Sequence, residues 1–148
     1  MCGRYVISDT VKVKQKYSFD VSVSYNITPS HEVLVLNPNP VLMKWSYSPK
    51  WKLDMNLINC RSETLTEKPS FRGALRCIFI ANGWYEWKRT NNQKLPYYHH
   101  CGEDLIYFAG IYNLESGCAV VTRESHSNIS YVHHRQPVVL EESQFDEW

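Results

Sequence analysis

The chain has 148 residues, a formal net charge of +1, 43% hydrophobic residues and 21% charged residues. This composition is typical of a single globular domain over 1–148, and it excludes a disordered chain and a uniformly basic nucleic-acid-binding protein. No apolar run approaches the roughly 20 residues of a membrane span, and no secretory signal precedes the first strand, so we expect a soluble protein with no membrane partner.

The periodicity and turn signals predict many short strands and a few short helices. Two of the expected turns, Asn37–Pro40 and Asn82-Gly83, predict hairpins. Ser8 or Asp9 can cap a helix that ends near Tyr17, and Ser70 can cap a helix over 71–75. Strands are expected at 5–8, 32–36, 41–47, 55–58, 76–81, 84–88, 96–101, 105–112, 118–122 and 137–140, further short helices at 125–132 and 141–148, and a loop at the end of 21–30. The predicted fold class is α+β, a β-rich single domain with short helices.

The cysteine and histidine spacings argue against disulfides and metals. An odd number of cysteines without a CxxC pair is typical of a reducing compartment. The pairs His99-His100 and His133-His134 are adjacent, and neighbours on a strand point to opposite faces, so neither pair has a ligand spacing. We expect no metal site and no cofactor. The cysteines are Cys2, Cys60, Cys77, Cys101 and Cys118.

The opening residues Met1-Cys2-Gly3-Arg4-Tyr5 carry an unusual chemical possibility. If an aminopeptidase removes Met1, Cys2 presents a free α-amine with a pKa near ~8 beside a thiol near ~8.5. Such a 1,2-aminothiol condenses with an aldehyde to an imine, and the thiol then closes a thiazolidine ring. The ordinary alternative is a frayed terminus without a function.

Three further positions are candidates for chemistry, although each also has an ordinary interpretation. Asn59 ends a predicted buried strand and can simply form a turn. Glu86 lies between two aromatic residues in a strand and can simply face solvent. His133 opens a polar run and can be a hydrogen-bonded structural residue.

Taken together, the motifs of the chain resemble the SOS-response-associated peptidase (SRAP) family, which shields abasic sites in single-stranded DNA. The resemblance extends along the chain in the order of the family's motifs. These are MCGRY at 1–5, NITPS at 26–30, KWSYSPKW at 44–51, NCRSET at 59–64, CIFIANGWYEW at 77–87, FAGIY at 108–112, VVTRES at 120–125 and HHRQPVVL at 133–140.

The resemblance implies a candidate catalytic set of Cys2, Asn59, Glu86 and His133. It also implies a DNA-binding set, in which basic residues suit phosphates and aromatic residues suit bases. This second set is Arg4, Trp45, Trp51, Arg61 and Arg135.

The implied activity is covalent capture of an abasic site through a thiazolidine on Cys2, which protects the lesion from strand cleavage. In this mechanism Glu86 moves protons during sugar-ring opening, His133 donates to the sugar oxygen, and Asn59 holds Cys2 in reacting geometry. The expected partner is single-stranded DNA containing abasic sites. The expected state is a monomer, and the expected location is cytoplasmic and nucleoid-associated, or nuclear.

Two other functions remain open on the residues alone. An N-terminal-nucleophile peptidase would use the Cys2 thiol, with its own amine as the base. A non-catalytic reader of single-stranded or modified DNA would need the aromatic and basic residues but not Cys2. The chain also departs from the family: it is shorter than most members, Gln136 stands where Met is usual, and Asn82 replaces the usual Asp.

Overall fold

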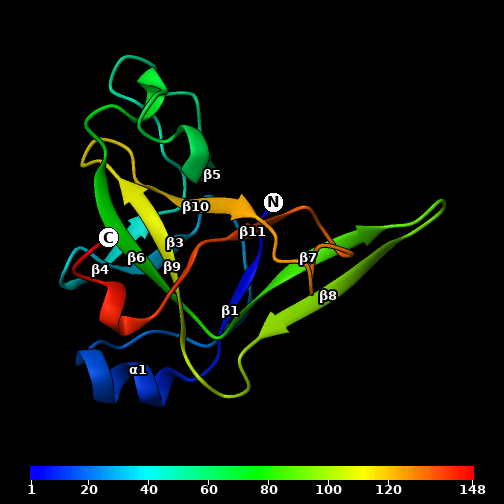
Figure 1. The fold of residues 1–148 in the computed structure, drawn as a ribbon. Helices are drawn as coiled ribbons and strands as arrows, with labels where there is room; N and C mark the ends of the chain where they lie inside the picture. Colours follow the sequence, from blue (N-terminus) through cyan, green and yellow to red (C-terminus); the bar gives the residue numbers. More distant parts are fainter.

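A computed structural model describes all residues from Met1 to Trp148, and it consists mainly of two β-sheets (Figure 1). A four-stranded sheet has the order β2-β1-β7-β8, and a larger sheet has the order β11-β10-β9-β6-β3-β4, with β12 paired to β9 and β5 to β10. The strands are β1 Tyr5–Ile7, β2 Ser24–Ile27, β3 Glu32–Leu36, β4 Pro40–Lys44, β5 Asn59–Arg61, β6 Leu75–Ala81, β7 Gly83–Arg89, β8 Lys94–His100, β9 Ile106–Tyr112, β10 Cys118–Glu124, β11 Arg135–Pro137 and β12 Val139–Leu140.

Helical structure is sparse, as the predicted β-rich α+β class requires. The one α-helix, α1 Thr10–Tyr17, begins after Asp9, whose carboxylate accepts the backbone N–H of Lys12. This confirms the predicted helix and its cap. Three short 3-10 turns cover Ser62–Thr64, Pro69–Phe71 and Glu142–Gln144. No helix combines the length and the apolar character needed to cross a membrane.

The largest core cluster packs the two sheets together through aromatic rings. Tyr5 of β1 contacts Trp45, Phe79 and Phe108, with ring centroids 5.4, 6.3 and 6.0 Å from its own. All four residues are almost completely buried. Because Tyr5 follows directly on the N-terminal segment, this packing anchors the first residues of the chain against the core.

The predicted hairpin at 37–40 is confirmed, because β3 and β4 pair antiparallel from Glu32 opposite Lys44 to Leu36 opposite Pro40. The second predicted hairpin, at Asn82-Gly83, is wrong. β6 pairs with β3 and β9, whereas β7 pairs with β1 and β8, so the chain passes at Asn82 from one sheet into the other.

Side-chain contacts explain this transition between the sheets. The Asn82 Oδ1 atom accepts the backbone N–H groups of Ser8 and Asp9, at 2.7 and 3.1 Å. Gly83 is required for a close approach rather than for a turn, since a Cβ at this position would collide with the ring of Tyr98. Asn82 and Gly83 are therefore needed for contacts with distant parts of the chain, and a rule based on local turn composition does not take such contacts into account.

Other differences concern the edges of elements. The strand expected at 55–58 begins only at Asn59, where β5 pairs in parallel with β10. Residues 125–132 form turns rather than a helix, because this serine-rich segment lacks strong helix formers. The helices expected at 71–75 and 141–148 are reduced to 3-10 turns, 137–140 is divided between β11 and β12, and β2 lies where only a loop was expected.

Candidate functional site

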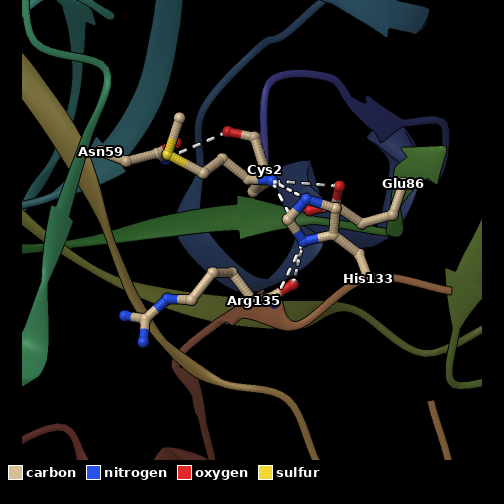
Figure 2. A network of polar contacts seen from close by, with 6 residues as sticks. Cys2, Asn59, Glu86, His133 and Arg135 are labelled. Carbon is tan, nitrogen blue, oxygen red and sulfur yellow. Dashed lines mark hydrogen bonds and ion pairs between the residues drawn. The ribbon is translucent and has the colours of Figure 1, made fainter. Parts of the chain in front are cut away.

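The amino terminus lies in a polar site at the edge of β7, where four distant segments of the chain meet (Figure 2). The Met1 ammonium group is 3.3 Å from Glu86 Oε2 and 3.1 Å from His133 Nε2. Asn59 contributes from the start of β5, and its Nδ2 atom donates to the Cys2 carbonyl oxygen at 3.1 Å. The structure thus brings together all four candidate catalytic residues of the sequence analysis.

Cys2 is completely buried beneath Met1. Burial raises the pKa of its thiol far above the ordinary value, and the nearby charge of Glu86 raises it further. The thiol is therefore protonated at neutral pH in this state. An activated cysteine nucleophile has the opposite property, a lowered pKa.

Glu86 is buried, so the interpretation of this residue as a solvent-facing strand residue is excluded. Burial raises the pKa of its carboxyl, while the charge of the N-terminal ammonium opposes that shift. Its Oε1 atom is buried and has no hydrogen-bond partner. A carboxyl with a raised pKa and a free acceptor is suited to proton transfer near neutral pH.

His133 is held by the backbone of Arg135 in a way that permits either neutral tautomer. Its Nδ1 atom is 3.0 Å from the Arg135 N–H and 3.3 Å from the Arg135 carbonyl oxygen. It can therefore accept from the one or donate to the other, leaving Nε2 as donor or acceptor respectively. Burial lowers the pKa of His133, and the N-terminal charge lowers it further, so the imidazole is neutral at pH 7.

Arg135 does not offer its guanidinium to a phosphate, which corrects the expectation from the sequence. Its Nη1 and Nη2 atoms donate to both carboxylate oxygens of Glu63, at 2.7 and 2.9 Å, and Nη2 also contacts Thr122 Oγ1 at 3.1 Å. Only 8% of the Arg135 side chain is exposed. Hydrogen bonding to Arg135 is the largest cause that lowers the pKa of Glu63 to about 2.

Trp45 is also corrected, because it is a core residue and not a base-stacking one. Its exposed fraction is 0%, and its indole N–H donates to the Ile58 carbonyl oxygen at 2.9 Å. The ring packs against Tyr5 and Phe79. Stacking on a base would require the core to open.

The other expected DNA-binding residues are accessible. Trp51 is 64% exposed and borders a groove of about 330 Å³ that Lys50 and Arg72 also line. Arg61 is exposed on β5. Arg4 is exposed, and its guanidinium carbon lies 5.5 Å from the ring centre of Trp87.

Met1 lies between two cavities. The larger one, of about 430 Å³, is lined by Met1, Arg4, Glu86, Trp87, Arg89, Lys94 and His133. The smaller one, of about 220 Å³, includes Met1, Asn59, Arg61 and Lys68 in its lining. Sequence reasoning missed Trp87, Arg89, Lys94 and Lys68, because strand alternation by itself places Trp87 and Arg89 on the face opposite Glu86.

No group of three or more His, Cys, Asp or Glu side chains is arranged to hold a metal ion. All five cysteines are free thiols. The site therefore consists of an amine, a thiol, a carboxyl, an imidazole and an amide, surrounded by basic residues.

Comparisons with known proteins identify relatives of this chain. The chain is 32% identical over 178 aligned positions to the abasic site processing protein YoqW of Bacillus subtilis, covering 100% of this chain and 80% of the relative. It is 28% identical to the abasic site processing protein YedK of Escherichia coli, covering 100% and 79%. With the abasic site processing protein HMCES of Xenopus tropicalis the identity is 28%, covering 67% of this chain and 41% of the relative.

The fold of this chain is also similar to that of solved structures. A crystal structure of a protein from Bacteroides thetaiotaomicron superposes with a TM-score of 0.83 at 22% identity, covering 99% of this chain and 80% of that one. The profile of the family described as SOS response associated peptidase (SRAP) matches residues 1–148. The chain therefore belongs to the SRAP family.

Proposed function

We propose that this chain captures abasic sites in single-stranded DNA by forming a covalent thiazolidine between the lesion and an N-terminal Cys2. Three relatives from bacteria and a vertebrate carry the name abasic site processing protein. The observation that carries the proposal is the position of the amino terminus between Glu86 and His133. These two proton-transfer groups flank an amine and not a thiol.

Met1 occupies the space in which the substrate would react. Its ammonium group fills the gap between Glu86 and His133. Met1 also lines both basic cavities and so stands between them. Removal of Met1 frees the Cys2 amine, vacates that gap and joins the cavities into one path for a DNA strand. The two unpartnered buried acceptors, Asn59 Oδ1 and Glu86 Oε1, are then available to N–H donors of the new terminus.

The proposed reaction begins at the amine. An abasic sugar opens to an aldehyde, and Glu86 and His133 carry the protons that ring opening requires. The Cys2 amine attacks the aldehyde carbon, and loss of one water gives an imine. The sulfur of Cys2 then bonds to the same carbon, its proton passes to nitrogen, and the five-membered ring is complete.

The burial of Cys2 supports this order of steps over a thiol-first peptidase. A protonated thiol is a poor nucleophile toward an amide, whereas it can still close a ring onto an imine held beside it. Asn59 fixes the Cys2 backbone through its hydrogen bond to the Cys2 carbonyl, which limits the geometries available to the ring closure.

Intact mass spectrometry of the protein mixed with an abasic single strand tests the proposal. The expected product has the mass of DNA plus protein beginning at Cys2, minus one water, and survives heating under denaturing conditions. A Cys2→Ser variant keeps the amine but offers only a hydroxyl, so its adduct should hydrolyse. The proposal fails if active protein retains Met1, or if the serine variant gives an equally stable product.

A further inference from the structure

The outer side of the four-stranded sheet carries a row of aromatic rings that are exposed or half-buried. The side chains alternate along β7 and β8, so that Trp84 and Glu86 point inward while their neighbours point outward. We call the outward set the outer ring face, and it consists of Tyr25, Tyr85, Trp87, Tyr98 and His100.

Four rings of the outer ring face are in contact with one another. Tyr85 is 6.2 Å from Trp87 and 5.1 Å from Tyr98, between ring centroids, and Tyr98 is stacked on His100 at 5.1 Å. Burial raises the pKa of the Tyr98 phenol, and the nearby phenols of Tyr85 and Tyr25 raise it further. Four of these rings, Tyr85, Trp87, Tyr98 and His100, therefore form one connected surface, and Tyr25 lies close enough to Tyr98 to affect its phenol.

Two backbone features place these rings. Gly83 has no Cβ, which lets the Tyr98 ring lie against the strand. A β-bulge between β1 and β2 places Tyr25 and Asn26 together opposite Val6, because Tyr5 pairs with Ile27 while Ile7 pairs with Ser24. Such a bulge redirects a side chain, and here it adds Tyr25 to the outer side.

Cross-strand aromatic pairs also stabilise a hairpin, and that role accounts for the contact between Tyr85 and Tyr98. It does not account for the exposure of the surface. Tyr98 is 41% exposed and Tyr25 is 66% exposed, so part of each side chain is accessible to an incoming group.

The charged residues of this sheet indicate which class of ligand the outer ring face would bind. The four strands contain a single carboxylate, Glu86, which is buried on the inner side. Arg4, Arg89 and Lys94 lie at the end of the row, where they and Trp87 line the larger cavity of the candidate site. Aromatic rings flanked by basic residues are the usual surface for single-stranded nucleic acid.

We propose that the outer ring face binds the single-stranded DNA that continues from the lesion on one side. This inference rests on the proposed function, since the row begins at the rim of the same cavity. From Trp87 to Gly83, opposite His100, the strand runs about 13 Å. That length accommodates up to about four nucleotides at the 3.4 Å spacing of a stacked strand. The recognition is by base stacking and is therefore independent of sequence.

The test uses single strands that contain a tetrahydrofuran analogue of the abasic site, which has no aldehyde and binds reversibly. The strands are lengthened one nucleotide at a time on either side of the analogue, and the Kd is measured by fluorescence anisotropy. For the unaltered protein, affinity should rise as the strand is lengthened on one side only, and the gain should disappear when a complementary strand is annealed there.

Two variants test whether the increase in affinity on lengthening the strand comes from the aromatic rings. Tyr25→Ser alters a well-exposed side chain, and Tyr98→Leu still covers Gly83 but removes the ring. Each should weaken binding of the long strand roughly tenfold, with little change for the shortest strand. Val11→Ser, at a 65% exposed apolar position on α1, is the matched control and should bind like the unaltered protein.

The inference is wrong if both variants keep the full gain from lengthening, or if they weaken short and long strands equally. A gain that depends on salt but not on the rings would also overturn it, because charge alone would then explain it. Crosslinking of the shortest true abasic strand is measured separately. Its failure would reject the proposed function and leave the length dependence of binding as an independent result.

Discussion

The ion pair between Glu63 and Arg135 allows a sharp test of its role, because its two partners differ in burial. Arg135 is 8% exposed and Glu63 is 49% exposed. Removing Glu63 as Glu63→Gln leaves a buried guanidinium without a counter-charge. Removing Arg135 as Arg135→Met leaves a half-exposed carboxylate that water can hydrate. Glu63→Gln should therefore be the more destabilising change.

The magnitudes follow from the same exposures. Breaking a fully buried pair costs about 3–5 kcal/mol, and the half-exposed Glu63 reduces this to about 2 kcal/mol for Glu63→Gln. Arg135→Met mainly loses the hydrogen bond to Thr122 and should cost about 1 kcal/mol. For a chain of this length, 2 kcal/mol corresponds to a decrease in Tm of roughly 4–8 °C.

Urea unfolding as a function of pH measures both values. Because pairing lowers the pKa of Glu63 to about 2, its stabilising effect is complete above the unfolded value of about 4.3 and is lost as the pH falls through about 2. The difference between the unaltered protein and Glu63→Gln should therefore be constant at neutral pH and shrink in acid.

A DNA-binding measurement separates this internal pair from a phosphate contact. Arg61→Ala should reduce the slope of log Kd against log salt by about 0.7, the value for one contact to a single strand. Arg135→Met should leave that slope unchanged. The reasoning is refuted if Arg135→Met flattens the slope as much as Arg61→Ala does, or if Arg135→Met destabilises the fold more than Glu63→Gln.

Three further outcomes are expected. Glu86→Gln should slow crosslinking about 10²- to 10⁴-fold with DNA affinity retained, measured by denaturing gels over time, and an unchanged rate would remove Glu86 from proton transfer. A residue inserted before Cys2 converts its amine to an amide and should abolish the heat-stable crosslink, so a normal yield would contradict the thiazolidine. Trp45→Leu should lower the free energy of unfolding by about 3 kcal/mol and leave the salt dependence of DNA binding unchanged, whereas a changed salt dependence would restore Trp45 to the DNA path.

The sequence predicted the strands of the core well, because β3, β6 and β9 are long apolar runs whose pattern is local. It also named the residues that meet at the amino terminus. That success came from motif resemblance, since nothing local indicates that Asn59 and His133 approach Cys2. Asn59 depends on the pairing of β5 with β10, which is distant in the chain, and His133 is placed by a turn segment just before β11, where no regular pattern is read from the sequence.

The failures have a common physical origin in tertiary contacts. Trp45 and Arg135 carry side chains suited to DNA, but the fold uses one to fill the core and the other to pair with Glu63. The Asn82-Gly83 step has the composition of a hairpin turn, yet its amide binds the segment before α1 and its glycine makes room for Tyr98. Residue type sets what a side chain can do, and burial decides which use is realised.

The passage of the chain from β6 into β7 has a consequence for how this scaffold tolerates change. Glu86 is carried on a strand that directly continues a core strand, so no loop sets its position. The alignment with the Bacillus subtilis relative has 178 positions against 148 residues here, which leaves 30 positions without a counterpart in this chain. Length changes are tolerated best in loops, and in the loops of this chain they would alter the rim of the cavities while the strands keep the distances around the amino terminus fixed. For protein engineering, the loops that border the cavities are therefore the parts to exchange when the preference for one type of DNA substrate is to be altered.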